Sequence, residues 1–175
     1  MNSSEFFPFL TARASVREYR RDGVEPEDLE FLLACASTAP SAGNREAWDV
    51  IAVTDPKMKE ALSRSALHQR HVAEAPLVLV VCARYDRSMS RYGERGTLYA
   101  IQDATIACTY LMLAAHARGL GSCWTGAFQE EGVRELLNIP APVRPVALLT
   151  VGKGTLPLSR TGRMPVGDHL HRETW

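Results

Sequence analysis

Apolar and polar positions along this chain follow periods that predict a layered domain of helices and strands. The longest apolar stretch, residues 97–118, contains neither proline nor glycine. Large apolar residues recur in it at helical spacing, and the small residues between them leave nearly every side apolar. A helix of this kind is buried by neighbours on all sides. We therefore expect 97–118 to be the central helix of the core, ended by Gly119.

Shorter periodic segments flank the central helix. Predicted helices cover residues 4–11, 26–38, 56–66 and 130–137, and predicted strands cover 48–53, 77–83 and 146–152. Proline at the first turn favours the helix starts at 26 and 56, and Ser4 is the expected cap of the first helix. The continuous apolar run 77–83 is typical of a central strand. This inventory predicts an α+β domain.

Two further segments have no clear period. Residues 84–96 are polar and predict an irregular, mobile connection. Residues 120–128, with the sequence LGSCWTGAF, predict a glycine-punctuated loop. Because glycine lets a backbone approach closely, such a loop could meet a flat ligand with backbone groups.

Length and charge narrow the function classes. At 175 residues the chain is long enough for one domain, 1–175, with a proper core. Lys+Arg and Asp+Glu both number 20, a balance that argues against a general nucleic-acid or anionic-membrane surface. No signal peptide is recognisable at the start, and Gln102 and Asp103 interrupt the apolar helix, so we expect no membrane span. A cytoplasmic location is predicted.

The cysteines and histidines do not predict a metal site. The four cysteines, Cys35, Cys82, Cys108 and Cys123, are widely spaced and form no CxxC pair. Buried free thiols in a reducing compartment are the expected arrangement. His68 and His71 are three residues apart, but no third ligand with suitable spacing is near. We expect them to be exposed histidines at a helix end.

Familiar catalytic motifs are also missing from the sequence. It contains no GxGxxG after a strand, no complete phosphate loop, no GxSxG and no HExxH. No catalytic side chain is predicted. If the chain is an enzyme, a cofactor carries its chemistry.

Two polar stretches are candidates for ligand binding. In an extended segment Arg13, Ser15 and Arg17 share one face, and two guanidiniums beside a hydroxyl fit an anion clamp. Spacing alone slightly favours the simpler interpretation, a solvated basic loop. The stretch Ala39–Asn44, APSAGN, offers Ser41 and Asn44 as short polar arms, although such loops are ordinarily connectors.

Six short stretches occur together in one order. They are Arg13-Ala-Ser15-Val-Arg17, Ala39-Pro40-Ser41-Ala-Gly43-Asn44 followed by Trp48, Ala75-Pro76, Gln102-Asp103, the run from Gly119 to Phe128, and Arg163-x-Pro165. In order and spacing, over nearly the whole chain, they resemble the FMN-dependent nitroreductase family. The resemblance implies a layered fold with a mostly antiparallel sheet flanked by helices. It also implies a homodimer whose C-terminal tail, 153–175, is exchanged onto the partner subunit.

The resemblance also implies roles for individual residues. Arg13 and Ser15 would hold the FMN phosphate, assisted by Arg163 or Arg160 from the tail, and Arg17 would lie near the N1/O2 edge of the flavin. Pro40, Ser41 and Asn44 would approach the flavin from the partner subunit. Trp124, Thr125 and Gly126 would present backbone groups to the ring, with an N–H near N5.

This sequence departs from the family pattern in three places. Ala14 stands where many relatives carry a second basic residue. Glu46-Ala47 stands where Gln-Pro is common, and the 84–96 connection is short. A short 84–96 connection implies a smaller lid and a more open flavin face. The resemblance therefore does not identify the electron acceptor.

The implied reaction is ping-pong: NADH or NADPH leaves a hydride on flavin N5, and an acceptor such as a nitroaromatic or quinone then takes it up. Other hypotheses stay open at this point. The chain could consume flavin, remove halogen from an aromatic, or bind FMN without turnover. A plain dimeric scaffold with solvated arginines would be colourless.

Overall fold

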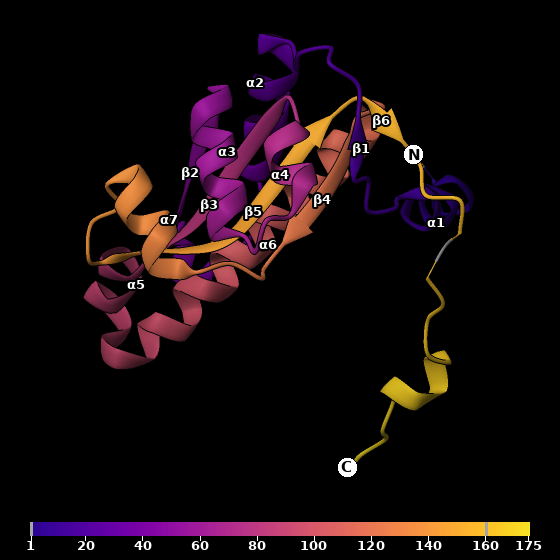
Figure 1. Cartoon of the computed structure of the whole chain (residues 1–175). Helices are drawn as coiled ribbons and strands as arrows, with labels where there is room; N and C mark the ends of the chain where they lie inside the picture. Colours follow the sequence, from indigo (N-terminus) through magenta and orange to yellow (C-terminus); the bar gives the residue numbers. More distant parts are fainter. Residues whose placement is uncertain (1, 160) are drawn as a thin grey trace.

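The computed structural model describes residues 2–159 and 161–175, so the predicted tail arginine Arg160 lies outside the described residues. Its centre is a four-stranded sheet of β2 (Trp48–Val53), β3 (Leu77–Arg84), β5 (Val143–Gly152) and β4 (Gly121–Thr125), in that spatial order (Figure 1). Each neighbouring pair is antiparallel. The expected mostly antiparallel sheet is therefore confirmed.

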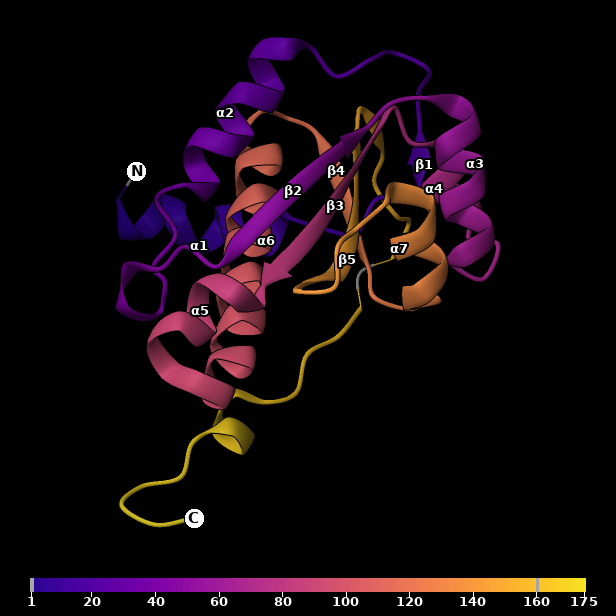
Figure 2. The ribbon, with the colours of Figure 1, turned by 90° about the vertical axis from the view of Figure 1, so that its left-hand side faces the viewer.

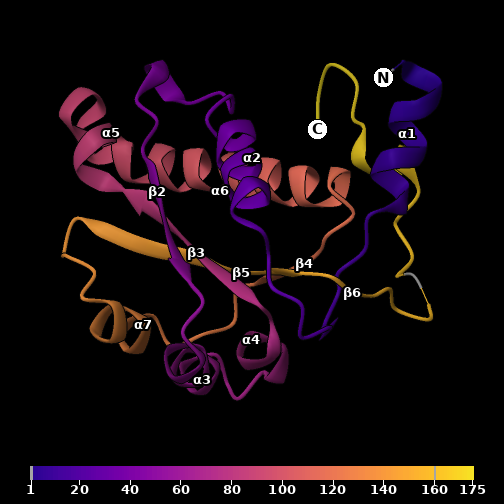
Figure 3. The same ribbon diagram turned by 90° about the horizontal axis from the view of Figure 1, so that it is seen from above.

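Helices cover both faces of the sheet, as Figure 3 shows. One face carries α2 (Pro26–Ala36), α5 (Tyr85–Tyr92) and α6 (Gly96–Ala117), and the other carries α3 (Pro56–Ser65), α4 (Arg70–Glu74) and α7 (Glu130–Leu137). The predicted helices and strands are all present, with ends shifted by a few residues.

The core consists of two clusters, one on each side of the sheet. In β3 the side chains of Leu77, Leu79 and Val81 belong to the cluster with α2 and α6. The alternate side chains of Val78 and Val80 belong to the cluster with α3, α4 and α7. Side chains on a strand point alternately to opposite faces, so a strand between two helical layers needs an unbroken apolar run.

The central helix α6 is the main element of the first cluster, as predicted. Its buried positions are mostly small, including Ala100, Ala104 and Ala107, which lets the helix lie close to the sheet. By length and composition alone, residues 85–117 are apolar enough to cross a membrane, contrary to the expectation drawn from the polar residues. Packing, rather than those residues, identifies α6 as a core helix.

The prediction for residues 84–96 was wrong. This segment completes β3 and then forms α5 and the 3-10 turn η2 (Gly93–Arg95). Tyr85, Met89 and Tyr92 recur in α5 at helical spacing, but this period spans only two turns of a polar segment, and tertiary contacts add to it. Ser88 is fully buried, and a Cβ atom at Gly96 would lie only 2.6 Å from the backbone nitrogen of Met89.

The prediction for residues 120–128 was also wrong in part, because Gly121–Thr125 is the edge strand β4 rather than a loop. Its flanking glycines concealed a strand whose buried Cys123 and Thr125 alternate with partly exposed Trp124. The last sheet strand likewise begins earlier than predicted, at Val143, because Pro145 is tolerated at an irregularity in the β3–β5 register.

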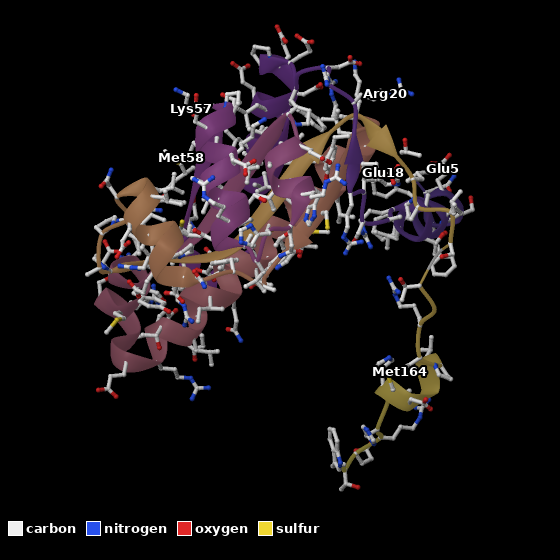
Figure 4. All side chains as sticks on the ribbon, viewed as in Figure 1. Glu5, Glu18, Arg20, Lys57, Met58 and Met164 are labelled. Carbon is white, nitrogen blue, oxygen red and sulfur yellow. The ribbon has the colours of Figure 1, made fainter. Side chains whose placement is uncertain are left out.

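The two ends of the chain lie at the surface. Helix α1 (Ser3–Ala12) is capped by Asn2 rather than by Ser4: the Asn2 side chain accepts from the Glu5 backbone N–H, and the Glu5 carboxylate accepts from the Asn2 N–H. After β6 (Gly154–Thr155), which pairs with β1 (Glu18–Tyr19), the tail and its 3-10 turn η3 (Val166–His169) extend away from the body (Figures 1 and 2). Met164 marks this tail in Figure 4.

The cysteine prediction is confirmed for the described residues. All four thiols are free, and Cys82, Cys108 and Cys123 are buried while Cys35 is partly buried. Burial raises the pKa of Cys82 and Cys108, which keeps both thiols protonated and unreactive.

Candidate functional site

The site predicted from the sequence begins at the outer edge of β4. The Ser122 carbonyl accepts a hydrogen bond from the Val16 N–H at 3.0 Å, and Ser15 bridges Ser122 in parallel orientation. In an antiparallel strand, residues two apart direct their backbone groups to the same side. Trp124 therefore also directs its N–H and C=O away from β5. It lies two residues past Ser122, where the segment with Ser15 and Val16 contacts the strand.

Close packing fixes the segment 13–17 against this edge. Val16 is buried, and a Cβ atom at Gly121 would lie 2.7 Å from the Val16 Cβ. Only glycine at position 121 allows this approach. Because Val16 points inward, the side chains on either side of it are free to face a ligand.

The structure brings four of the predicted residues together. A cavity of about 500 Å³ is lined by Arg13, Ser15, Arg17 and Arg163, together with Leu10, Thr11, Ala14, Pro157, Ser159 and Thr161. The cavity lies between the end of α1 and the start of the tail. Three cationic side chains and several hydroxyl groups around one cavity suit an anion such as a phosphate.

Arg13 supplies a test of whether a phosphate fits. Its Nη1 atom is buried and has no hydrogen-bond partner among the described residues. A buried donor without a partner costs free energy, and a charged phosphate oxygen would satisfy it. Arg163 is more loosely placed, since its Nη1 donates to the nearby carbonyls of Thr161 and Gly162 in an exposed segment.

Arg17 acts on two buried groups behind β4. His71, only 6% exposed, lies with its Nε2 2.8 Å from the Thr125 hydroxyl, so the expectation of an exposed histidine was wrong. Burial, and then the positive charge of Arg17, lower the pKa of His71. Burial raises the pKa of Cys123, which Arg17 and Ser15 partly oppose. His71 is thus a neutral support for the end of β4.

The loop that contains Pro40, Ser41 and Asn44 is held by the Gln102-Asp103 stretch. Asp103 is 2% exposed, and its carboxylate accepts from the backbone N–H groups of Ala42 at 2.9 Å and Ala47 at 3.2 Å. Ser41 accepts from the Glu46 N–H, which tightens the loop further. The sequence marked Asp103 as a motif residue but gave no signal of these long-range contacts.

This loop does not join the Arg13 cavity within one chain. Pro40 and Ser41 line a different cavity of about 510 Å³, bounded by α6. Along α6, Asp103 beneath this loop and His116, which contacts Phe9 of α1, are 13 residues apart, or about 20 Å at 1.5 Å per residue. One chain therefore holds the two halves of the predicted site apart.

A smaller cavity lies beyond the end of β4. It measures about 350 Å³ and its lining includes Gly126, Ile101 and Phe128. At its rim Arg144 and Glu130 form an ion pair with 2.9 Å between Nε and Oε2. Among residues 2–159 and 161–175, no group of three or more His, Cys, Asp or Glu side chains could hold a metal ion.

Comparison with known proteins decides the family. A family model described as the nitroreductase family matches residues 10–70 and 58–153. The chain is 31% identical to a putative NADH dehydrogenase/NAD(P)H nitroreductase of Archaeoglobus fulgidus, over 98% of this chain and 99% of that protein. This chain belongs to the nitroreductase family.

Further relatives agree with this nitroreductase assignment. The chain is 28% identical to an FMN reductase [NAD(P)H] of Bacillus subtilis, over 98% of this chain and 75% of that protein. Among solved structures, NfrA2 of B. megaterium superposes with a TM-score of 0.91 at 29% identity, over 100% of this chain and 76% of that one. The nitroreductase-like layered fold expected from the six sequence stretches is therefore confirmed.

Proposed function

We propose that this chain transfers electrons from NADH or NADPH to nitroaromatics, quinones or similar acceptors by a ping-pong reaction on bound FMN. As a nitroreductase-family member with relatives named NAD(P)H nitroreductase and FMN reductase, the chain is an NAD(P)H-dependent flavin oxidoreductase. The observation that carries the site is the buried Nη1 of Arg13, which has no partner among residues 2–159 and 161–175 and lies beside Ser15, Arg17 and Arg163.

In this proposal the anion cavity holds the phosphate of FMN and the edge of β4 supports its ring. Arg13 and Ser15 bind the phosphate, with Arg163 assisting. The outward backbone groups from Trp124 to Gly126 meet the ring. FMN, when bound, supplies the position that accepts and gives up the hydride.

Arg17 tunes the charge balance of the site. A fixed cation near the N1/O2 edge stabilises the negative charge that the ring gains on reduction. No described side chain is required as an acid or base. Thr125, supported by the neutral His71, keeps the end of β4 in position.

A second copy of the chain completes the site. Pro40, Ser41 and Asn44 lie about 20 Å along α6 from the Arg13 cavity, so a symmetric partner has to supply them. We propose a homodimer in the cytoplasm. Because β6 pairs with β1 of its own chain, only the part of the tail 153–175 that follows β6 would lie on the partner. Apolar side chains support this proposal, because Phe7 of α1 is 71% exposed and Trp175 of the tail is 100% exposed in the single chain.

A second candidate activity is reductive removal of halogen from an aromatic ring. The chain is 24% identical, over 86% of its length, to an iodotyrosine deiodinase of Haliscomenobacter hydrossis. The same cofactor cavity would serve this reaction, and only the acceptor would differ. FMN binding without turnover is the remaining alternative.

An absorption spectrum of the purified protein tests these proposals. Flavin bands that bleach with NADH or NADPH under anaerobic conditions would support a reductase. Adding a nitroaromatic, a quinone or iodotyrosine to the reduced protein then identifies the acceptor that restores the bands. Flavin bands that persist with both donors would overturn the reductase proposal, and a protein that takes up no FMN would overturn the site.

A further inference from the structure

A basic and aromatic surface lies where α5 meets the loop after α2. We call it the arginine–tyrosine patch, formed by Arg45, Arg91, Arg95, Tyr92 and Tyr99. The two tyrosine rings pack edge to face, with centroids 5.0 Å apart. The Arg91 guanidinium lies 5.6 Å from the Tyr92 ring centre and that of Arg95 5.5 Å from the Tyr99 ring centre. The patch is thus ordered by contacts among its own side chains.

The arginines of the patch differ from their neighbours in how their charge is balanced. Arg84 and Arg87, nearby, form ion pairs with Asp49, and Arg84 also pairs with Asp86. In contrast, the described residues provide no carboxylate ion pair for any of the three patch arginines. Glu46 and Glu94, from the same two segments, are exposed but do not pair with them.

Neutral contacts hold these cations in place instead. Arg45 donates to the Arg87 carbonyl and to the Ser90 hydroxyl, and Arg95 donates to the Tyr99 hydroxyl at 2.6 Å. These contacts fix the side chains without neutralising them. Such cations, with remaining N–H groups exposed, are prepared to bind an anion.

The patch borders the loop that we place against the partner's FMN. Tyr99 lines the same cavity of about 510 Å³ as Pro40 and Ser41. Gly43, in the left-handed region with φ of 56°, lies so close that a Cβ atom there would be 3.2 Å from Cζ of Arg91. A molecule that reaches the flavin past this loop therefore passes the patch.

We propose that the arginine–tyrosine patch binds the phosphate groups of the nicotinamide donor and so sets the affinity for NADH and NADPH. This inference rests on the proposed function. The guanidiniums bind the phosphates through charge-assisted hydrogen bonds, and the tyrosine rings offer an apolar surface to the adenine. The charged remote part of the donor thereby helps to orient the nicotinamide.

Anaerobic flavin reduction in the FMN-loaded protein tests the proposal, with three donors compared. NADPH and NADH carry phosphates, whereas 1-benzyl-1,4-dihydronicotinamide carries none. The variant is Arg91→Ala/Arg95→Ala, and its matched control is Arg64→Ala, an exposed arginine of α3 outside every cavity described above. Thermal unfolding checks that the double variant and the control both fold like the wild type.

We expect the double variant to lose about tenfold in kcat/KM for NADPH, the size expected for two exposed charge-assisted contacts, and to keep its rate with the benzyl compound. The dependence of the NADPH rate on salt should also weaken. A loss confined to NADPH assigns the patch to the 2′-phosphate, and an equal loss for NADH assigns it to the pyrophosphate.

Two results would overturn the patch proposal: an unchanged NADPH rate, or equal losses with NADPH and the benzyl compound. The proposed function fails in a different way. If wild-type protein loaded with FMN is reduced by the benzyl compound but by neither NADH nor NADPH, the chain is not a nicotinamide-dependent reductase, whatever the variants do.

Discussion

Asp103 and Arg13 both have buried polar atoms, but these atoms differ in whether the chain satisfies them. Asp103 is satisfied within the chain, because both carboxylate oxygens accept backbone N–H groups. Arg13 keeps a buried nitrogen without a partner among the described residues. We therefore expect Asp103 to contribute to the stability of the fold and propose that Arg13 contributes to ligand binding.

We expect Arg13→Ala to weaken FMN binding by at least tenfold, because a charge-assisted hydrogen bond contributes about 1.5–3 kcal/mol. The measurement is the Kd for FMN from fluorescence quenching. The stability of the FMN-free protein should hardly fall, since Arg13 Nη1 has no hydrogen bond to lose within the described part of the chain. Arg64→Ala serves as the control. Unchanged FMN occupancy would remove Arg13 from the phosphate site.

Asp103→Ala is expected to lower the free energy of unfolding by about 2–4 kcal/mol, because it leaves one buried and one partly buried backbone donor unpaired. Urea unfolding measures this change. Asp103→Asn keeps one acceptor oxygen and should cost about half as much. If both variants unfold at the wild-type midpoint, Asp103 does not hold the Ala42–Ala47 loop.

The lowered pKa of His71 predicts a dependence of stability on pH. Above its unfolded value of 6.5 the residue is neutral in both states, and below that value only the unfolded state readily takes up the proton. The wild type should therefore lose stability as pH falls below about 6.5. His71→Gln keeps a partner for Thr125 but does not titrate. The difference in unfolding free energy between the two proteins, followed from pH 7.5 to 5, should shift against the wild type, and a constant difference would contradict the assignment.

At the scale of elements, apolar periodicity predicted the helices and strands that local sequence determines. It missed those that depend on tertiary contacts. Helix α6 and strand β3 were predictable because their apolar patterns are long and unbroken. Helix α5 was missed because its period, Tyr85, Met89 and Tyr92, is short and lies in a polar segment. The burial of Ser88 and the close approach at Gly96 also stabilise it, and neither can be read from a local pattern. Strand β4 was missed because Gly121 marks a close contact with Val16 rather than a turn.

The site was predictable to a similar degree. Alternation placed Arg13, Ser15 and Arg17 on one face, and the cavity confirms that they lie together. The buried position of His71 depends on Thr125, 54 residues away. No local pattern reports a contact of that kind, so reasoning from spacing left His71 at the surface.

Gly121→Ala tests whether the close approach of β4 and the Arg13 segment builds the site. The added methyl group would contact Val16, and overpacking of this kind costs about 1–3 kcal/mol. We expect lower stability and weaker FMN binding in the same variant, measured by urea unfolding and by FMN titration. Adding Val16→Ala should restore part of both losses.

Gly23→Ala is the matched control for this experiment. Nothing lies within 4 Å of a Cβ atom at Gly23, and its φ is not in the left-handed region. This substitution should be neutral or slightly stabilising. If Gly121→Ala behaves like Gly23→Ala, the segment 13–17 does not depend on close contact with β4.

At the scale of the whole molecule, two features of the single chain are incomplete: the proposed flavin site and the burial of the tail. The residues that we propose for flavin binding lie near both ends of α6, and the tail presents apolar side chains to solvent. Four apolar side chains of the tail are exposed: Leu158, Val166, Leu170 and Trp175. The tail has no core of its own in which they could be buried. The proposed symmetric partner would complete both, because each copy would supply the other with a loop and with a surface for the tail.

The tail prediction separates dimer formation from phosphate binding. Substituting Leu158, Val166 and Leu170 with serine removes apolar contacts but keeps Arg163 in the cavity lining. We expect the wild type to be a dimer by light scattering and the triple variant to dissociate at low micromolar concentration, with FMN released as it does so. Leu67→Ser, at an exposed leucine after α3, is the control for a general loss of surface apolarity.

A triple variant that stays dimeric with full FMN would place the tail off the interface. A monomer that retains FMN would show that one chain holds the cofactor alone, because the loop with Pro40, Ser41 and Asn44 could not then reach it.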